Sequence, residues 1–268
     1  MSQELVIAPG GALGDAVLLW PMLRAKAAAG VSVCLVTSES HGLLAARFLR
    51  LRARSIHTPP FPQLWQPTFS PAPEPDVRLV LTFAGADTNW TRNASAAFPN
   101  ARLEICTPPD RAFALSFDAP PQRPAMHGER WALHAGAGGL AKQWPLDRWI
   151  ALSHAVPSRL LAGEAEADRW TASQRDSFLA AGGVFLDSLH DLADVLLASR
   201  GLVAADCGPG HLAAQLGLPV ISLFGPTDPA RWAPVGPATR VLAPPSPRPM
   251  TWLSPETVLE AIHDSARQ

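Results

Sequence analysis

Residues 201–232 predict a repeating unit of a parallel α/β sheet. The apolar run 202–205 indicates a buried strand that ends at Asp206. A glycine-containing turn follows, and we expect a helix to begin at His211 and to end at Gly217. Residues 220–224 predict a second buried strand. This order of strand, turn, helix and strand places the turn at the carboxyl end of the first strand, where open α/β sheets bind ligands.

The turn itself favours an anion. The first amides of a helix have no partner inside the helix and carry partial positive charge, and Gly208 and Gly210 let a phosphate approach the backbone around Pro209. Asp206 can accept a hydrogen bond from a sugar hydroxyl, and His211 lies beside the same space. The alternative is that the glycines only make a tight turn, that Asp206 caps the helix and that His211 is a surface residue.

The N-terminal residues predict a second unit of the same kind. A buried strand over residues 5–8 leads into a glycine turn that contains Gly11 and Gly14, and Asp15 stands where the turn meets an apolar helical pattern interrupted at Pro21. Asp15 is either a carboxylate on the floor of a binding site or a helix cap. The turn lacks the G-x-G-x-x-G spacing, so we set nicotinamide dinucleotide binding aside.

A third glycine-rich loop follows the strand predicted for residues 131–134. It spans residues 135–145 and holds one lysine, Lys142, which suits the binding of a diphosphate. The alternative is a glycine linker with an exposed lysine. Further on, residues 163–166 (G-E-A-E) are expected to turn into a helix that reaches about residue 181.

The middle of the first half is less informative. Arg50 and Arg52 belong to a stretch in which arginines alternate with apolar residues, which predicts an edge strand with one charged face. That face is either solvated or contacts an anionic acceptor or a membrane. Residues 58–75 are rich in proline and carry Phe61, Trp65 and Phe69, which either line an acceptor site or hold the loop against the domain.

Composition narrows the class of protein. The chain has 268 residues, 47% of them hydrophobic, and a net charge of -1, which gives no global electrostatic argument for nucleic acid. Its three cysteines have no metal-ligand spacing and fit a reducing compartment. We see no signal peptide and no apolar run of the length that a membrane span needs, so we expect a cytoplasmic protein.

Three motifs at strand ends together resemble glycosyltransferase family 9, which contains the ADP-heptose:lipopolysaccharide heptosyltransferases. They are G-A-L-G-D at 11–15, H-A-G-A-G-G-L-A-K-Q-W-P-L-D-R-W at 134–149, and the long motif that starts D-C-G-P-G-H at 206. The resemblance implies an α/β GT-B fold, with two Rossmann-like domains facing a central cleft. We place an acceptor-side domain at residues 1–124 and a nucleotide-sugar-binding domain at 125–268, with a final helix over 255–266 that either stays in the second domain or packs back on the first.

The resemblance also implies roles for residues. Asp15 corresponds to the general base of an inverting transfer, and Lys142 to the residue that neutralises the donor diphosphate. Glu166 corresponds to an acidic residue near the nucleoside, with Glu164 as the alternative. The other donor-binding residues implied are Ala135, Gly136, Asp206, Gly208, Pro209, Gly210, His211 and Thr227, and those on the acceptor side are Gly11, Gly14, Arg50 and Arg52.

The implied activity is transfer of a sugar, heptose from ADP-heptose, to a lipopolysaccharide-core or related saccharide or glycolipid acceptor. We expect no metal and no other cofactor, because a lysine and helix amides can stabilise the leaving diphosphate and no D-x-D signature stands in a suitable loop. Contact with the inner face of the cytoplasmic membrane stays open. Two alternatives also stay open: a catalytically silent protein that binds nucleotide sugars, and a transferase of this family with a different donor.

Overall fold

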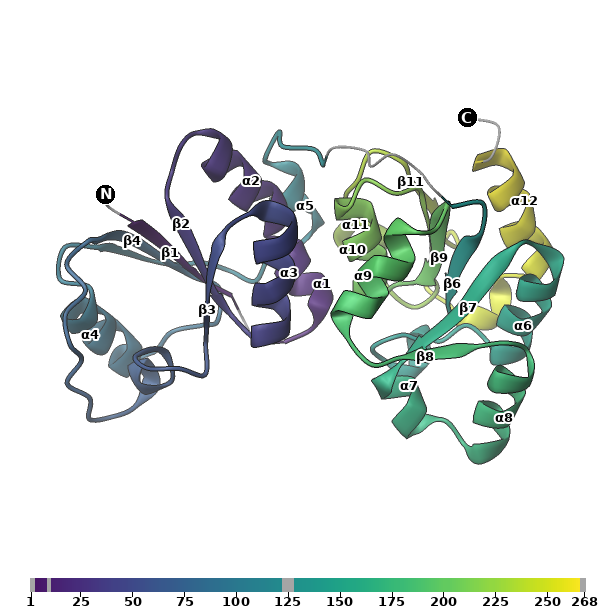
Figure 1. Cartoon of the computed structure of the whole chain (residues 1–268), viewed down its shortest axis with the longest axis horizontal. Coiled ribbons are helices and arrows are strands. Elements are labelled where there is room, and N and C mark those ends of the chain that lie inside the picture. Colours follow the sequence, from purple (N-terminus) through teal and green to yellow (C-terminus); the bar gives the residue numbers. More distant parts are fainter. Residues whose placement is uncertain (1–2, 9–10, 122–127, 266–268) are drawn as a thin grey trace. The chain divides into compact units, whose positions relative to one another are not determined.

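The computed structural model describes residues 3–8, 11–121 and 128–265. Contacts divide the chain into two units, Met1–Ala119 and Pro120–Gln268, each built on a parallel sheet (Figure 1). The division falls a few residues before the boundary expected after residue 124. The expected boundary at residue 124 and the last residue of the helix expected over 255–266 lie outside the described residues.

The described part of the first unit holds a five-stranded parallel sheet in the order β3-β2-β1-β4-β5. Its strands are β1 (Gln3–Ile7), β2 (Val33–Thr37), β3 (Arg52–Ser55), β4 (Val77–Thr82) and β5 (Arg102–Ile105). Its helices are α1 (Leu13–Val17), α2 (Trp20–Ala28), α3 (Glu39–Leu49), the 3-10 turn η1 (Phe61–Trp65), α4 (Thr88–Ala97) and α5 (Arg111–Leu115). In Figure 1, α2 and α3 lie on one face of this sheet and α4 on the other.

The proline-rich segment is fastened to the core of the first unit. Phe61 is fully buried, and Trp65 and Phe69 pack against the same apolar cluster. Of the two readings of these aromatic residues, the structure favours the one in which they hold the loop against the domain. Pro21 stands in the first turn of α2, where a missing amide hydrogen costs little, so the helical pattern is divided into α1 and α2 as expected.

The described part of the second unit holds a six-stranded parallel sheet in the order β11-β10-β9-β6-β7-β8. Its strands are β6 (Trp131–His134), β7 (Ser158–Gly163), β8 (Val184–Leu186), β9 (Gly201–Ala205), β10 (Val220–Leu223) and β11 (Thr239–Leu242). Its helices are α6 (Leu146–Ala155), α7 (Glu164–Arg169), α8 (Ala172–Ala180), α9 (Leu189–Leu197), α10 (Gly208–Gln215), α11 (Pro229–Trp232) and α12 (Pro255–Ser265), with 3-10 turns η2 (Leu140–Lys142) and η3 (Met250–Trp252). β6, β9 and β10 are fully buried, as expected for parallel strands covered on both faces.

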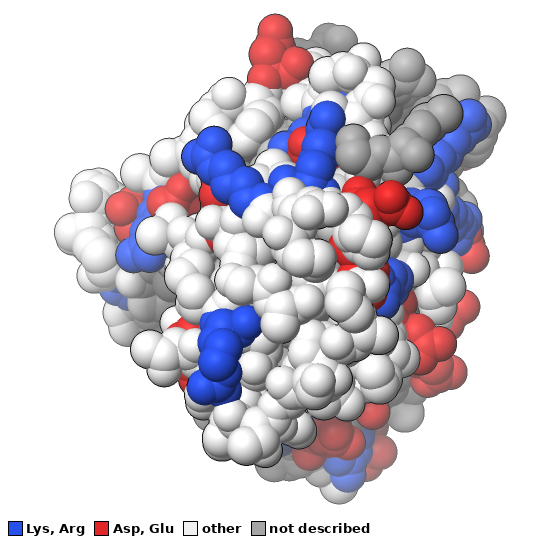
Figure 2. All heavy atoms as spheres, turned by 90° about the vertical axis from the view of Figure 1, so that its left-hand side faces the viewer, with Lys and Arg blue, Asp and Glu red and all other residues white. Residues whose placement is uncertain are grey.

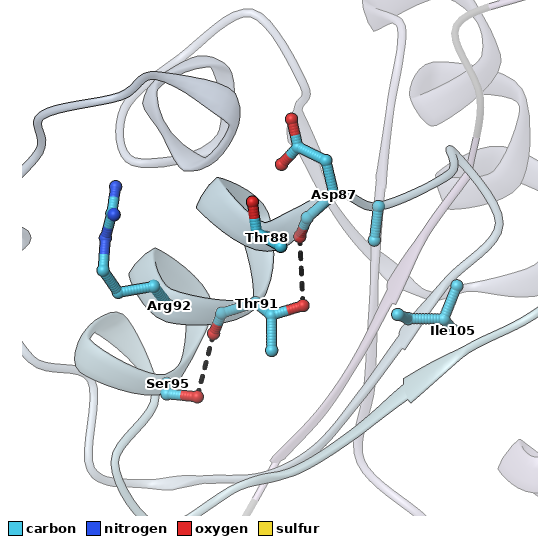
Figure 3. Close-up of a pocket in the computed structure, with 7 residues that line it drawn as sticks. Asp87, Thr88, Thr91, Arg92, Ser95 and Ile105 are labelled. Carbon is cyan, nitrogen blue, oxygen red and sulfur yellow. Dashed lines mark hydrogen bonds between the residues drawn. The ribbon is translucent and has the colours of Figure 1, made fainter.

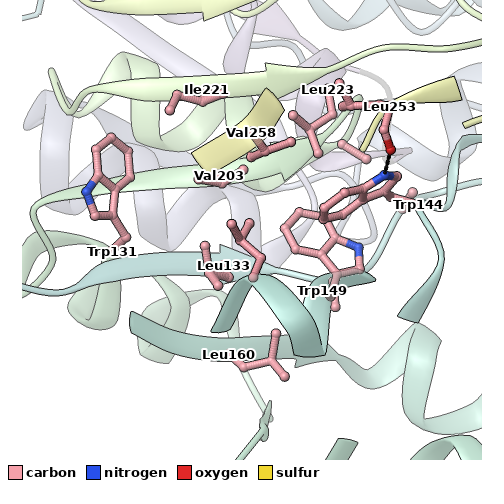
Figure 4. Packing of buried hydrophobic residues seen from close by; sticks show 14 of the residues in the cluster. Trp131, Leu133, Trp144, Trp149, Leu160, Val203, Ile221, Leu223, Leu253 and Val258 are labelled. Atoms are coloured by element: carbon pink, nitrogen blue, oxygen red, sulfur yellow. Dashed lines mark hydrogen bonds between the residues drawn. The ribbon is translucent and has the colours of Figure 1, made fainter. Parts of the chain in front are cut away.

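The core of the second unit joins the start of α6 to the C-terminal segment (Figure 4). Trp144 and Trp149 meet edge to face, with ring centroids 4.8 Å apart, and the indole of Trp144 donates a hydrogen bond of 2.9 Å to the Leu253 carbonyl. Arg148 donates to the Thr251 carbonyl at 2.7 Å. α12 buries Val258, Ala261 and Ile262 in this cluster, so its apolar face is occupied within its own unit.

Three local predictions were wrong. The single helix expected after residue 166 is two helices, α7 and α8, and Glu166 lies inside α7 rather than in a turn. Arg50 lies outside β3, since it ends α3 in the left-handed conformation with a φ of 54°. The helix expected to begin at His211 begins at Gly208.

Candidate functional site

Three loops of the second unit meet because the strands that carry them are neighbours. β10, β9 and β6 are adjacent in the sheet, and all three run parallel. Asp206 follows β9, Thr227 lies in the turn after β10, and Lys142 ends η2 in the loop after β6. The carboxyl ends of parallel strands lie at the same edge, so residues far apart in the sequence reach one place.

At this edge Asp206 binds both a lysine and a threonine. Lys142 Nζ lies 3.0 Å from Asp206 Oδ2, and Thr227 Oγ1 donates a hydrogen bond of 2.8 Å to the same oxygen. The Asp206 side chain is 7% exposed and that of Lys142 is 34% exposed. The structure thus brings together three of the residues predicted to hold the donor.

The glycine turn after Asp206 is the first turn of α10. Cys207 is the N-cap, without a side-chain hydrogen bond, and Gly208, Pro209 and Gly210 are the first helical residues. The alternative that Asp206 caps this helix is therefore wrong. Pro209 has no amide hydrogen, and the Gly210 amide donates a hydrogen bond of 3.1 Å to the Cys207 carbonyl, so this helix start favours an anion through its dipole and the Gly208 amide.

His211 is buried, and its lowered pKa keeps the imidazole uncharged at neutral pH. It is 5% exposed, which excludes the surface position considered above, and burial lowers its pKa to about 4 although the Asp206 carboxylate acts in the opposite direction. Its ring has a hydrogen bond to the Trp232 backbone, while Nδ1 has no partner among the described residues. Burial also raises the pKa of the Cys207 thiol to about 12, so this cysteine is not a ready nucleophile.

Glu166 fastens the glycine loop after β6. Its Oε1 accepts a hydrogen bond of 3.2 Å from the Ala137 amide, and its Oε2 accepts one of 3.2 Å from the Gly163 amide. A Cβ at Gly136 would lie 2.3 Å from this carboxylate, so only glycine fits there. Glu166 is 3% exposed whereas Glu164 is exposed, which makes Glu166 the acid that lies against the loop. Ala135 is buried in the same loop.

Two further residues hold this loop and were not predicted. His134, the last residue of β6, is buried, and its Nδ1 lies 3.3 Å from the Gly136 amide nitrogen. Burial lowers the pKa of His134, with Glu166 acting in the opposite direction. Arg169 of α7 donates to the Gly138 carbonyl at 3.3 Å. A polar residue at the end of an apolar strand, directly before a glycine loop, was the signal available for His134.

In the first unit, Asp15 occupies the first turn of α1. The N-cap is Ala12, so the alternative that Asp15 is the cap residue is wrong. Asp15 is half-buried, and its Oδ2 lies 3.9 Å from the position of a Cβ built on Gly11. Gly14 precedes it in the same turn. An acid in the first turn is favoured by the helix dipole, which stabilises the ionised form.

The acceptor-side arginines are exposed. Arg52 lies on β3, which is an edge strand as predicted, and Arg50 lies just before it. The neighbouring Arg54 is paired with Glu74 at 2.8 Å and lies over the Phe61 ring. The face in Figure 2 shows basic and acidic side chains interspersed among wide uncharged areas of the described residues.

A hollow of about 580 Å³ lies beside α4 (Figure 3). It contains none of the predicted site residues, since its lining consists of Ala86, Asp87, Thr88, Thr91, Arg92, Ser95 and Ile105. The hydroxyls of Thr91 and Ser95 bond to carbonyls of their own helix at 3.1 and 2.9 Å. The hollow therefore offers few free polar groups to a ligand.

The residues that the structure describes hold neither a metal-ion cluster nor a membrane-spanning helix. Within residues 3–8, 11–121 and 128–265, no three His, Cys, Asp or Glu side chains are grouped so that they could hold a metal ion. In the same ranges no helix has the length and apolar character that crossing a membrane requires.

Comparison with known proteins identifies the family. The sequence model described as "Glycosyltransferase family 9 (heptosyltransferase)" matches residues 109–251, just over half of the chain. The chain belongs to glycosyltransferase family 9. The match includes the motif at 134–149 and the one that starts at 206, so the resemblance to this family is confirmed, whereas the motif at 11–15 lies outside the matched residues.

Curated and solved relatives agree with this membership. Lipopolysaccharide heptosyltransferase 1 of Pseudomonas aeruginosa is 36% identical over 120 residues, which are 42% of this chain and 32% of that protein. The match therefore spans about a third of the length of this curated relative. A family 9 glycosyltransferase from Veillonella parvula superposes with a TM-score of 0.74 at 13% identity, covering 98% of this chain and 97% of the other. The structure of E. coli heptosyltransferase WaaC with ADP superposes with a TM-score of 0.68 at 17% identity, covering 98% of this chain and 99% of the other.

The structural matches confirm the fold class of this family 9 chain. Its two parallel sheets with flanking helices are the two Rossmann-like units of a GT-B protein. The glycine turns that carried the resemblance lie at the carboxyl ends of β1, β6 and β9, where such units bind ligands.

Proposed function

We propose that this chain is an inverting glycosyltransferase that transfers heptose from ADP-heptose to a lipopolysaccharide-core or related saccharide acceptor. The observation that carries the proposal is the cluster of Lys142, Asp206 and Thr227 beside the start of α10, in a chain of family 9. A lysine beside the positive end of a helix dipole, at one sheet edge, is suited to a diphosphate. The curated relatives are lipopolysaccharide heptosyltransferases, and WaaC was solved with ADP, which favours heptose and ADP for the donor.

In this proposal Asp15 is the general base. Its carboxylate takes the proton of the acceptor hydroxyl as that oxygen bonds to the anomeric carbon, while the bond from this carbon to the diphosphate breaks and ADP leaves. Attack opposite the leaving group inverts the configuration. Negative charge grows on the diphosphate during this step, and Lys142 together with the amides of Gly208 to His211 stabilises it without a metal. Glu166 keeps the loop that carries Lys142 in place.

The proposal also assigns residues of the first unit to the binding of the acceptor. Gly11 and Gly14 leave room beside Asp15 for the acceptor, and Arg50 and Arg52 contact its anionic groups. We place the reaction in the cytoplasm, with contact with the inner face of the cytoplasmic membrane when the acceptor is a glycolipid. No nucleic acid takes part.

Calorimetric titration with ADP, UDP and GDP, followed by turnover of ADP-heptose with a lipopolysaccharide-core acceptor, tests the proposal. Asp15→Asn is expected to lower turnover by roughly 10²- to 10⁴-fold with ADP affinity unchanged, because a general base acts only in the chemical step. Asp76→Asn, an exposed aspartate of the same unit, is the matched control. Full turnover of Asp15→Asn would show that another group is the base.

The same titrations separate the alternatives. A catalytically silent protein would bind ADP without turnover of the wild type with any sugar acceptor. A different donor would appear as selective binding of UDP or GDP. Lys142→Ala is expected to weaken nucleotide affinity roughly 10- to 100-fold, since it removes a charged contact to the diphosphate, whereas substitution of Arg159, an exposed residue of β7, by alanine should not.

A further inference from the structure

One carboxylate oxygen of the candidate donor site is shared by two partners of different character. Asp206 Oδ2 lies 3.0 Å from Lys142 Nζ and accepts the 2.8 Å hydrogen bond from Thr227 Oγ1. Asp206 is almost fully buried, and its amide donates a 3.1 Å hydrogen bond to the Leu223 carbonyl of the neighbouring strand. The backbone of Asp206 is therefore fixed to the sheet, and its carboxylate is held by Thr227.

The lysine is held far less firmly. Lys142 ends a 3-10 turn that follows Gly138 and Gly139, and a Cβ built on either glycine meets no atom within 4 Å. Leu140 in the same turn is 73% exposed. An ion pair whose lysine is one-third exposed is weak, because water competes for the ammonium group. The Lys142 side chain can therefore move away from Asp206, whereas Asp206 stays at the end of its strand.

We propose that Thr227 is a positioning residue that holds the Asp206 carboxylate while Lys142 exchanges Asp206 for the diphosphate of the donor. The inference rests on the proposed function, because it needs a diphosphate at the start of α10. Before binding, Asp206 has two partners. After the exchange, the buried carboxylate retains the Thr227 hydroxyl, so this hydrogen bond contributes more to the liganded state than to the unliganded one.

This role differs from that of a residue that lines the donor pocket. If Thr227 contacts the donor directly, the loss of its hydroxyl weakens binding whatever residue stands at position 206. If it acts through Asp206, the loss matters only while position 206 carries a negative charge. A double-mutant cycle between the two positions separates these roles.

The experiment is titration of the full chain with ADP, UDP and GDP. We expect Thr227→Val to weaken binding of the preferred nucleotide roughly tenfold and Thr227→Ser to restore it. Asp206→Asn should bind the nucleotide more tightly than the wild type, because it removes the competitor for Lys142. Adding Thr227→Val to Asp206→Asn should then change affinity by less than about twofold. Thr239→Val is the matched control, since the Thr239 hydroxyl has no hydrogen-bond partner among the described residues.

The outcomes distinguish the two proposals. A wild type that binds none of the three nucleotides overturns the proposed function and this inference with it. A wild type that binds, combined with an equal loss on Thr227→Val in both backgrounds, leaves the proposed function standing and overturns the positioning role. So does an Asp206→Asn variant that binds the nucleotide more weakly than the wild type, or a Thr227→Val variant with unchanged affinity.

Discussion

Glu166→Gln is the substitution whose effect on stability follows most directly from the structure. The two carboxylate oxygens of Glu166 accept from two different backbone amides, those of Ala137 and Gly163. Glutamine keeps one acceptor oxygen and turns its NH₂ group toward the other amide, so one buried N–H loses its partner. Hydrogen bonds to charged groups contribute about 1.5–3 kcal/mol each, and an unpaired buried amide costs about 1–3 kcal/mol.

Both bonds are 3.2 Å long, so the lower end of these ranges applies, and we expect a loss of about 2.5 kcal/mol in the free energy of unfolding. A loss of this size lowers the melting temperature of a unit of 150–250 residues by about 5–10 °C. Differential scanning calorimetry of Glu166→Gln beside Glu164→Gln measures it, because Glu164 is the exposed acid of the same helical turn. Equal melting temperatures for the two variants would refute the bridging role of Glu166.

The glycine opposite the carboxylate gives an independent check of the same contact. Gly136→Ala places a Cβ 2.3 Å from the Glu166 carboxylate, and we expect a loss of about 1–3 kcal/mol from the displacement. Gly138→Ala is the control, because its Cβ would enter open space. Combined with Glu166→Ala, the Gly136→Ala substitution should cost much less than it does alone. Additive losses would mean that the two residues are not in contact.

Three further predictions concern protonation, reactivity and metals. The folded-state pKa of His211, about 4, lies below the unfolded value, so the unfolded state binds more protons between pH 4 and 6.5. The stability of the fold therefore falls as the pH is lowered through this range. His211→Gln should flatten the dependence of the melting temperature on pH, and an unchanged slope would contradict the burial of this ring. Cys207, with a thiol pKa of about 12, should react with iodoacetamide at pH 8 more slowly in the native protein than after denaturation, as followed by peptide mass spectrometry; equal rates in both states would contradict the raised pKa of this thiol. Transfer activity should persist in EDTA, because the proposed step uses Lys142 and helix amides, and a loss restored by one divalent metal would contradict it.

The strands were the most predictable part of this fold. A parallel strand buried on both faces is mostly apolar, so β1, β6, β9 and β10 are visible in the sequence as short segments made largely of apolar residues. The start of α10 was harder to predict, because Gly208, Pro209 and Gly210 are typical of turns. All three are tolerated in a first helical turn, whose amides are not bonded within the helix.

The candidate site was predictable in its residues but only partly in its contacts. The residues of the cluster follow three separate strands: Lys142, Asp206 and Thr227. The order of these strands in the sheet does not follow from the spacing or the periodicity of the sequence. The bond from the Gly163 amide to Glu166 follows a local pattern, an acid at the third position of a helix, but the bond from the Ala137 amide joins residues 29 positions apart, which no local pattern encodes. The pairing of Lys142 with Asp206 arises only once the sheet has brought both residues to one edge.

The family match and the folded second unit end at different residues, because the segment around Leu253 is bonded to the start of α6. The family match stops at residue 251, but the Leu253 carbonyl accepts from Trp144, two residues after Lys142, and α12 closes the core beneath it. A chain cut at residue 251 would retain every glycine turn and yet lose the support of the lysine loop. The last helix therefore supports the loop that carries Lys142, and a truncation that removes it is expected to loosen this loop as well as to lower the stability of the unit.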